Sequence, residues 1–354
     1  MTSTYSRSRR RAVTFFAICV ALAAAWATAL LAPLAAQAAP TVFPVCIQMG
    51  GQAGPDIAGN MVVWTDNRNG GLDIYGRNLN SKNAFAVCAN TSQQDNPSVT
   101  ATVVGSRTEY VAVWVDKRNH DGGDIYGRNL TTKRSFVVVR SGTLKWFPEI
   151  VDQWVVWIEA STPAGPYTVK ARDLAAGKTY RIATSTVLSS LGVSRRTVGD
   201  KAVHTAVYVT AGGDISGRNL PGGAPFRVSQ KSTFEWSPDI SANRVVWWEA
   251  GGRVMLKNLK TGNRTYVGQG SRPRIDGELV TWDGGGKGGA FALDYKAGAA
   301  VYVRNIAHST NVVRIAQSNQ TCLFPAVSGH TLVWETGPAQ RVLSHIHIFG
   351  ARVP

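Results

Sequence analysis

Two polar loops carry the residue types that could hold a metal ion. The first runs from Asp66 to Asp73 and the second from Asp116 to Asp124. Carboxylate and amide oxygens combined with glycine turns suit Ca²⁺, so Asp66, Asp73, Asp116 and Asp124 are weak candidate ligands. The spacing does not match an EF-hand loop, and an arginine lies within each loop (Arg68, Arg118). The alternative is that these carboxylates accept hydrogen bonds from turn amides or pair with the arginines. No other metal or cofactor is predicted.

Four further residues are candidates for contact with a ligand, namely Trp146, Trp236, Trp248 and Lys287. Trp146 and Trp236 each precede a proline by two positions, so equivalent loops could present both indoles on one face to a glycan or a peptide. Packing in the interior is the alternative, because tryptophan is usually largely buried. Lys287 lies in a glycine-rich run, residues 284–289, which predicts a flexible loop because no helix follows it.

No motif for catalysis is found. There is no serine in a Gly-x-Ser-x-Gly turn, and none of the six histidines lies in a recognisable general-base motif. Acidic residues are sparse, and a catalytic carboxylate pair cannot be located from their spacing. We therefore predict no catalytic residue and favour a non-enzymatic role.

The elements that would position these residues form a repeat. A proline precedes a tryptophan by nine positions in five places, from Pro55 and Trp64 to Pro325 and Trp334. Each tryptophan follows a short run rich in β-branched residues, which favours a strand. With Trp114 and Tyr208 added, the aromatic anchor recurs seven times at spacings of 35 to 52 residues. Repeats of this length indicate an array of small structural units.

Each unit is predicted to contain four short strands. In the first unit these are the segment at Pro55, the run ending at Trp64, residues 74–79 and residues 85–87. No amphipathic segment of helical period occurs after residue 40, so helices should be nearly absent. Four strands repeated about seven times predict an all-β fold, a β-propeller of seven blades, with six or eight as alternatives.

Closure of the ring supports this count. The last unit, from Pro325 to the end, has three strands, whereas residues 41–46 resemble an isolated fourth strand. We expect this N-terminal strand to pair into the last blade, which would leave no free sheet edge.

The segments at residues 55–68, 73–79 and 124–130 resemble the TolB-like, WD40-like (PD40-type) propeller repeats of bacterial secreted or surface proteins. The resemblance covers residues 41–354 and implies the propeller fold. It carries over no catalytic residue, because the motif residues belong to the structural frame. We expect no counterpart of the additional α/β domain of TolB, and repeats of this kind serve many unrelated functions.

Residues 1–38 are predicted to be a secretory signal peptide, with residues 39–354 forming a single propeller domain. Four arginines precede an apolar stretch, and Ala36-Gln37-Ala38 provides a cleavage site. The alternative is an uncleaved membrane anchor, since the apolar stretch is long enough to span. Cleavage would give a secreted, extracellular or periplasmic protein with no remaining membrane span.

The remaining chain carries a net charge of +12, from a total of +16 less the four signal arginines. This charge favours a glycan or an anionic envelope polymer as partner, without sequence-specific binding of nucleic acid. The alternative is structural charge, because many basic residues recur at one repeat position, as at Arg77, Arg128 and Arg218. A monomer is expected.

Three cysteines follow the signal: Cys46, Cys88 and Cys322. In an oxidising compartment one pair is expected, and we favour Cys46 with Cys322 because both belong to the closing region of the ring.

Three functions remain open. The first is a secreted, non-catalytic module that binds a glycan, an envelope component or a protein. The second is a structural component of an envelope assembly, and the third is an extracellular polysaccharide hydrolase or lyase with its site at the central channel. A polar or acidic channel would support the enzyme, whereas a channel lined by frame residues would contradict it.

Overall fold

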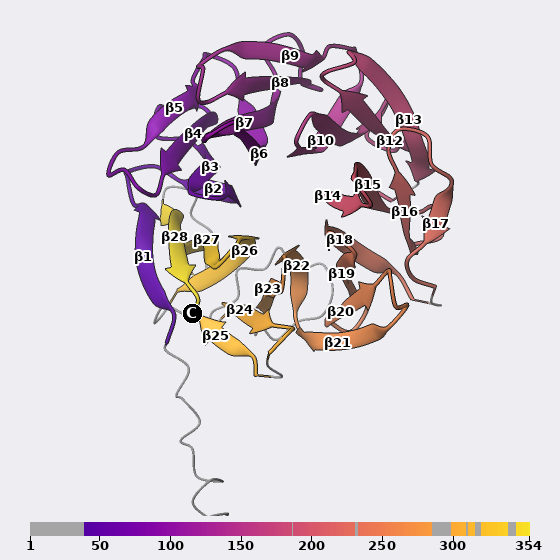
Figure 1. Cartoon of the computed structure of the whole chain (residues 1–354). Coiled ribbons are helices and arrows are strands. Elements are labelled where there is room, and N and C mark those ends of the chain that lie inside the picture. The colour runs from indigo at the N-terminus through magenta and orange to yellow at the C-terminus, as the bar shows by residue number, and fades with distance from the viewer. Residues whose placement is uncertain are drawn as a thin grey trace, which may run out of the picture. The chain divides into compact units, whose positions relative to one another are not determined.

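The protein is a seven-bladed β-propeller. The computed structural model describes residues 39–185, 187–230, 233–284, 299–308, 311–315, 320–338 and 345–354. Residues Pro40–Val353 form one compact unit. Their 28 strands make seven four-stranded antiparallel sheets that follow one another around a ring (Figure 1). The described residues include no helix that is long and apolar enough to cross a membrane.

Every blade is a meander of four strands from the axis outward. The innermost strands are β2 (Gln52–Ala58), β6 (Gln94–Val104), β10 (Leu144–Val151), β14 (Gly192–Val198), β18 (Glu235–Ser241), β22 (Ser271–Asp276) and β26 (Thr321–Ser328). The second strands are β3 (Met61–Asp66), β7 (Arg107–Asp116), β11 (Trp154–Ala160), β15 (Lys201–Val209), β19 (Arg244–Glu249), β23 (Leu279–Gly284) and β27 (Thr331–Gly337). The third strands are β4 (Asp73–Asn78), β8 (Asp124–Asn129), β12 (Tyr167–Asp173), β16 (Ile215–Asn219), β20 (Arg253–Asn258), β24 (Ala300–Asn305) and β28 (His347–Arg352). The outer strands are β5 (Phe85–Cys88), β9 (Ser135–Val139), β13 (Lys178–Ser185), β17 (Pro225–Arg227), β21 (Arg264–Gln269), β25 (Val313–Ile315) and β1 (Thr41–Cys46).

The N-terminal strand closes the ring as predicted. β1 is the outer strand of the seventh blade and pairs antiparallel with β28, so that Phe43 lies opposite Gly350. Consecutive innermost strands contact one another, and β26 contacts β2. Both ends of the chain therefore contribute to one blade, and that sheet has no unpaired third strand.

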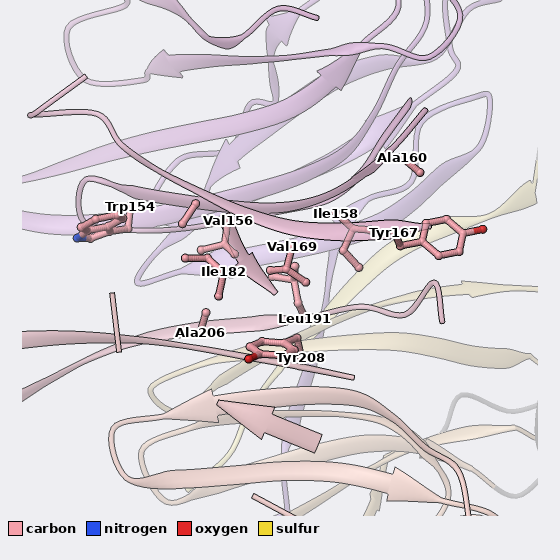
Figure 2. Close-up of a cluster of buried hydrophobic side chains, with 11 residues drawn as sticks. Trp154, Val156, Ile158, Ala160, Tyr167, Val169, Ile182, Leu191, Ala206 and Tyr208 are labelled. Atoms are coloured by element: carbon pink, nitrogen blue, oxygen red, sulfur yellow. The ribbon is translucent and has the colours of Figure 1, made fainter. Parts of the chain in front are cut away.

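The tryptophan anchors fill the spaces between blades. Trp64, Trp114, Trp157, Trp247, Trp282 and Trp334 are at most 1% exposed, and Tyr208 takes the same place in the fourth blade. Figure 2 shows one such cluster, in which Val156 and Val169 of the third blade meet Ala206 and Tyr208 of the fourth. Burial of an aromatic side chain of this kind stabilises by roughly 1.5–3 kcal/mol. The repeated aromatic residue is thus the main apolar contact from blade to blade.

A glycine on the third strand makes room for a phenylalanine from the outer strand. Gly76, Gly127 and Gly217 lie opposite Phe85, Phe136 and Phe226. A Cβ at Gly127 would lie 2.4 Å from the ring of Phe136, so the ring covers the glycine directly. Phe43 covers Gly350 in the same way, which shows that β1 replaces an ordinary outer strand.

The two irregular units fit the ring by different means. The extra residues of the second unit lengthen β6 and β7 to 11 and 10 residues. In the fourth unit, Leu191 stands where the other blades have proline, and it is fully buried.

The predicted Cys46–Cys322 disulfide is wrong, because Cys46, Cys88 and Cys322 are all free thiols. Cys46 is on the outer strand β1 and Cys322 on the innermost strand β26 of the same sheet. Three strand spacings of about 4.8 Å separate opposite edges of such a sheet, far more than a disulfide spans.

Candidate functional site

The most concentrated group of charges lies where the innermost strands meet. Each contributing residue directly follows the proline that characterises its blade: Asp56, Ser98, Glu149, Asp239 and Arg274. In these blades a β-bulge just before this position shifts the register between the innermost strand and the second strand. The residue before the proline has a left-handed backbone, with φ between 49° and 57°. A bulge re-aims the side chain that follows it, so these residues turn toward their counterparts in other blades.

Arg274 links three carboxylates from three other blades. Its Nη1 donates to Glu149 Oε1 at 3.0 Å. Its Nη2 is 3.6 Å from Asp56 Oδ1, and its Nε is 3.7 Å from Asp239 Oδ2. These partners come from β2, β10 and β18, whereas Arg274 is on β22 (Figure 1). Since β2 and β10 are not neighbours of β22 in the ring, the guanidinium reaches across the propeller axis. We call Asp56, Ser98, Glu149, Asp239 and Arg274 the axial cluster.

Backbone amides of the next blade complete the axial cluster. Val99 N donates to Asp56 Oδ2 at 2.8 Å, and Ile275 N donates to Asp239 Oδ2 at 2.9 Å. Ser98 Oγ donates to Glu149 Oε2 at 3.1 Å. Each acid therefore joins its own blade to another, and the axial cluster helps to hold the ring together.

The charges of the axial cluster do not balance, since three carboxylates surround one guanidinium. Burial and the neighbouring charge of Glu149 raise the pKa of Asp56 to about 6, although Arg274 opposes that rise. Burial also raises the pKa of Asp239, again against the attraction of Arg274. The side chains are 13–25% exposed, so solvent reaches them. The arrangement can therefore hold a proton on Asp56 up to about pH 6.

Sequence reasoning missed the axial cluster, although the proline repeat gave its position. The residue after the proline varies among acid, serine, arginine and alanine, while its neighbours stay regular. In the fourth blade the equivalent position is Gly192, which lies opposite Val207 on the second strand just as Asp56 lies opposite Val63. A Cβ at Gly192 would lie 2.9 Å from Cα of Asp239, so no side chain fits there.

The candidate calcium ligands Asp66 and Asp116 are paired with arginine. Arg68 donates to Asp66 through Nε at 2.9 Å and through its backbone N at 3.0 Å. Arg118 repeats both contacts with Asp116. The guanidiniums of Arg68 and Arg118 also stack on tyrosine rings at 4.1 Å. Pairing with arginine and with turn amides is the alternative to calcium binding that the sequence left open, and it is confirmed for Asp66 and Asp116.

The other two candidate calcium ligands also have partners. Asn69 donates to Asp73 at 2.9 Å. Asp124 accepts from Asn119 at 2.7 Å and lies 3.6 Å from the ammonium of Lys145, which is fully buried. Lys145 also donates to the carbonyls of Gly123, Ser141 and Thr143. Over the described ranges, no group of three or more His, Cys, Asp or Glu side chains could hold a metal ion. Calcium binding stays a prediction.

The three candidate tryptophans that the structure describes are buried or partly buried. Trp248 is buried, and Trp146 is partly buried with its ring 5.7 Å from Tyr167 in an edge-to-face contact. Trp236 stacks on Trp248 with ring centroids 4.6 Å apart, and Phe234 stacks on Trp236 at 5.9 Å. Phe234 is 52% exposed, so this three-ring stack opens to solvent at one end. Sequence analysis did not single out Phe234. Lys287 lies outside the described residues.

The recurring basic residue of the third strand joins blades. Arg77 donates to the carbonyl of Val45, Arg128 to that of Val87 and Arg218 to that of Ile182. Lys257 and Arg304 repeat the contact with Val228 and Val267. In five blades, therefore, this charge has a structural partner on the outer edge of the preceding blade.

Comparison with known proteins identifies the fold alone. No protein-family model matches the sequence, and no curated protein is significantly similar to it. An oligogalacturonate lyase from Vibrio parahaemolyticus aligns with a TM-score of 0.59 at 13% identity, over 88% of this chain and 93% of that one. The propeller domain of the Trilobed protease from Pyrococcus furiosus gives 0.56 at 12% identity, over 87% and 94%. TolB from Acinetobacter baumannii gives 0.48 at 12% identity, over 73% and 63%. The lyase and the protease domain confirm the predicted propeller architecture as a fold, and these identities carry no function across.

Proposed function

We propose that the protein is a non-catalytic binding module for a glycan. The observation that carries this proposal is the stack of Phe234, Trp236 and Trp248, which ends in an exposed ring. Aromatic faces provide a rigid apolar surface on which the C–H face of a sugar ring can lie. Trp248 is fixed in the core and holds Trp236, so the platform is ordered before a ligand arrives, which lowers the entropic cost of binding.

The polar contacts to a ligand must come from residues other than Glu235 and Glu249, which are next to the stack in the sequence but are buried. Sugar recognition combines an apolar face with a few oriented hydrogen-bonding groups, as small-molecule sites generally do. The net charge of +12 after residue 38 favours an acidic glycan over a neutral one.

A retention assay with matched variants tests the proposal. Residues 39–354 are passed over immobilised acidic and neutral polysaccharides at low and moderate salt. Phe234→Ala should lose at least tenfold in affinity, whereas Tyr266→Ala should not, although Tyr266 is an equally exposed ring in the fifth blade. Equal retention of both variants would refute the platform, and no retention of the parent protein on any polysaccharide would refute the glycan.

A second candidate function rests on the axial cluster. A protonated Asp56 beside Glu149 provides a general acid and a second carboxylate, the pair that glycoside hydrolysis needs. We propose this enzyme as the alternative and not as the first choice, because Arg274 already pairs with the two carboxylates that would have to act on a substrate. Release of oligosaccharide that Glu149→Gln abolishes and Asp276→Asn preserves would establish the enzyme. The absence of any product from every polysaccharide tested would exclude it.

Export is part of the proposal. It is supported by the arginine-rich start, the apolar stretch and the Ala36-Gln37-Ala38 site. N-terminal sequencing of protein recovered outside the cytoplasm should find Ala39 as the first residue, and an intact N-terminus would contradict cleavage.

A further inference from the structure

A groove between the fourth and fifth blades is lined by three cationic side chains. Its volume is about 260 Å³, and its walls include Arg227 of β17, Gln230 after that strand, Lys257 of β20 and Arg264 of β21. Gly262, in the turn between β20 and β21, lies open at its edge, since no atom comes within 4 Å of where its Cβ would be. The groove lies at the outer strands, away from the axial cluster.

The groove exists because the fifth blade has lysine at the position where five of the other blades have arginine. In the first blade, Nη1 of Arg77 donates to the preceding blade and its Nε donates to the carbonyl of Ser81 in the following turn. Arg218 does the same with Ile182 and Gly223. Lys257 has a single nitrogen, which donates to the carbonyl of Val228 at 2.7 Å. The space that a guanidinium would fill beside the turn is left open.

The charge in the groove exceeds that of the acids around it. Arg264 lies 3.1 Å from Glu249 and 3.9 Å from Glu235, both of which are buried behind it. Arg227 donates to Gln230 Oε1, and among the described residues neither Arg227 nor Lys257 forms an ion pair. The ammonium of Lys257 keeps two of its three donors after bonding Val228.

We propose that this groove is a binding site for a single anionic group, a sulfate, phosphate or carboxylate. Arg227 and Arg264 would supply planar donors, and Lys257 would supply a point charge at the base. The proposal is independent of the glycan platform, because it rests on different residues and applies to inorganic anions as well as to acidic polymers.

Lys257→Arg gives a sharp test, because it keeps the charge and the bond to Val228 while the larger guanidinium fills the groove. Thermal unfolding of residues 39–354 is followed in sodium sulfate, phosphate and acetate against sodium chloride at equal ionic strength. The parent protein should gain stability with at least one oxyanion as its concentration rises. Lys257→Arg and Arg227→Met should each shift the half-saturating concentration at least tenfold upward.

Two controls separate the outcomes. Arg172→Met removes a basic residue from the same repeat position of the third blade and should retain the parent response. Among the described residues, the Arg172 side chain forms a hydrogen bond only with Thr179 of its own sheet. Phe234→Ala should also retain it, whatever its effect on glycan binding. Sulfated and uronic oligosaccharides, titrated in the same way, distinguish the source of the anion. An equal response in all variants, or no oxyanion response in the parent, would overturn the proposal.

Discussion

At the scale of single residues, Arg274 has the most demanding position in the molecule. It is the counter-ion of three carboxylates, which come from three other blades. Removing one partner of a largely buried ion pair leaves uncompensated charge, which costs more than the pair itself contributes. The axial cluster is therefore sensitive to the loss of this guanidinium in particular.

Arg274→Met should lower the free energy of unfolding by about 3 kcal/mol, measured by urea denaturation at pH 7. Arg244→Met is the matched control, since Arg244 pairs with Glu278 at 2.7 Å in an exposed setting. It should cost at most about 1 kcal/mol. Adding Asp239→Asn to Arg274→Met should recover part of the loss. Equal costs for the two single variants would contradict the role of the axial cluster.

Asp56 gives the axial cluster a pH dependence of defined sign. Its pKa is raised to about 6 in the folded protein, so between about pH 4 and pH 6 the folded state holds a proton that the unfolded state has lost. Stability from this group is present at low pH and is lost as the pH rises through that window. Asp56→Asn cannot ionise but retains an acceptor for Val99 N.

Relative to the parent protein, Asp56→Asn should therefore gain about 1–2 kcal/mol between pH 4.5 and pH 7.5. Denaturant unfolding at the two pH values measures this difference. A stability difference that does not change with pH would show that Asp56 ionises normally.

At the scale of strands, two innermost strands approach each other so closely that a side chain does not fit at one of the positions that follow the proline in other blades. Gly192 on β14 faces the backbone of Asp239 on β18. Gly192→Ala should destabilise the protein by about 1–3 kcal/mol, because backbone atoms would have to move. Gly142→Ala, where the Cβ would meet no atom within 4 Å, should be nearly neutral in the same thermal unfolding assay. Two equally tolerated substitutions would contradict the packing.

Substitution of the recurring arginine tests the contact between a third strand and the outer strand of the preceding blade. Arg128 donates to the carbonyl of Val87 at 2.7 Å across the blade boundary, whereas the recorded bond of Arg172 stays within its own sheet. Arg128→Met should cost about 1–2 kcal/mol more than Arg172→Met, as expected for a charge-assisted hydrogen bond. Chemical denaturation of both variants decides this, and a larger cost at Arg172 would count against the assignment.

Strand order and blade number could be predicted from the sequence because their signals are local. The spacing from Pro55 to Trp64 fits one hairpin, and the resemblance of residues 41–46 to an outer strand predicted ring closure correctly. The axial cluster could not be predicted, because Asp56, Glu149 and Arg274 meet only after the ring has closed. The disulfide prediction failed for a related reason, since belonging to one blade does not bring its inner and outer strands together.

At the scale of the whole molecule, the charges have two distinct settings. The axial cluster is acidic and satisfied largely by its own contacts, whereas the recurring basic residues lie on the third strands, where the groove at Lys257 opens. The aromatic stack at Phe234 is a third surface feature, without charge of its own. A propeller held together in this way provides a rigid frame on which separate binding surfaces can be placed.

The most direct measurement is an equilibrium titration of residues 39–354 with the oligosaccharide that is best retained, followed by tryptophan fluorescence, with product analysis of the same samples. The glycan-binding account predicts a saturable change in fluorescence, at least tenfold weaker affinity for Phe234→Ala, unchanged affinity for Tyr266→Ala, and no cleaved oligosaccharide. Cleavage that depends on Glu149, or binding that Phe234→Ala leaves intact, would contradict it.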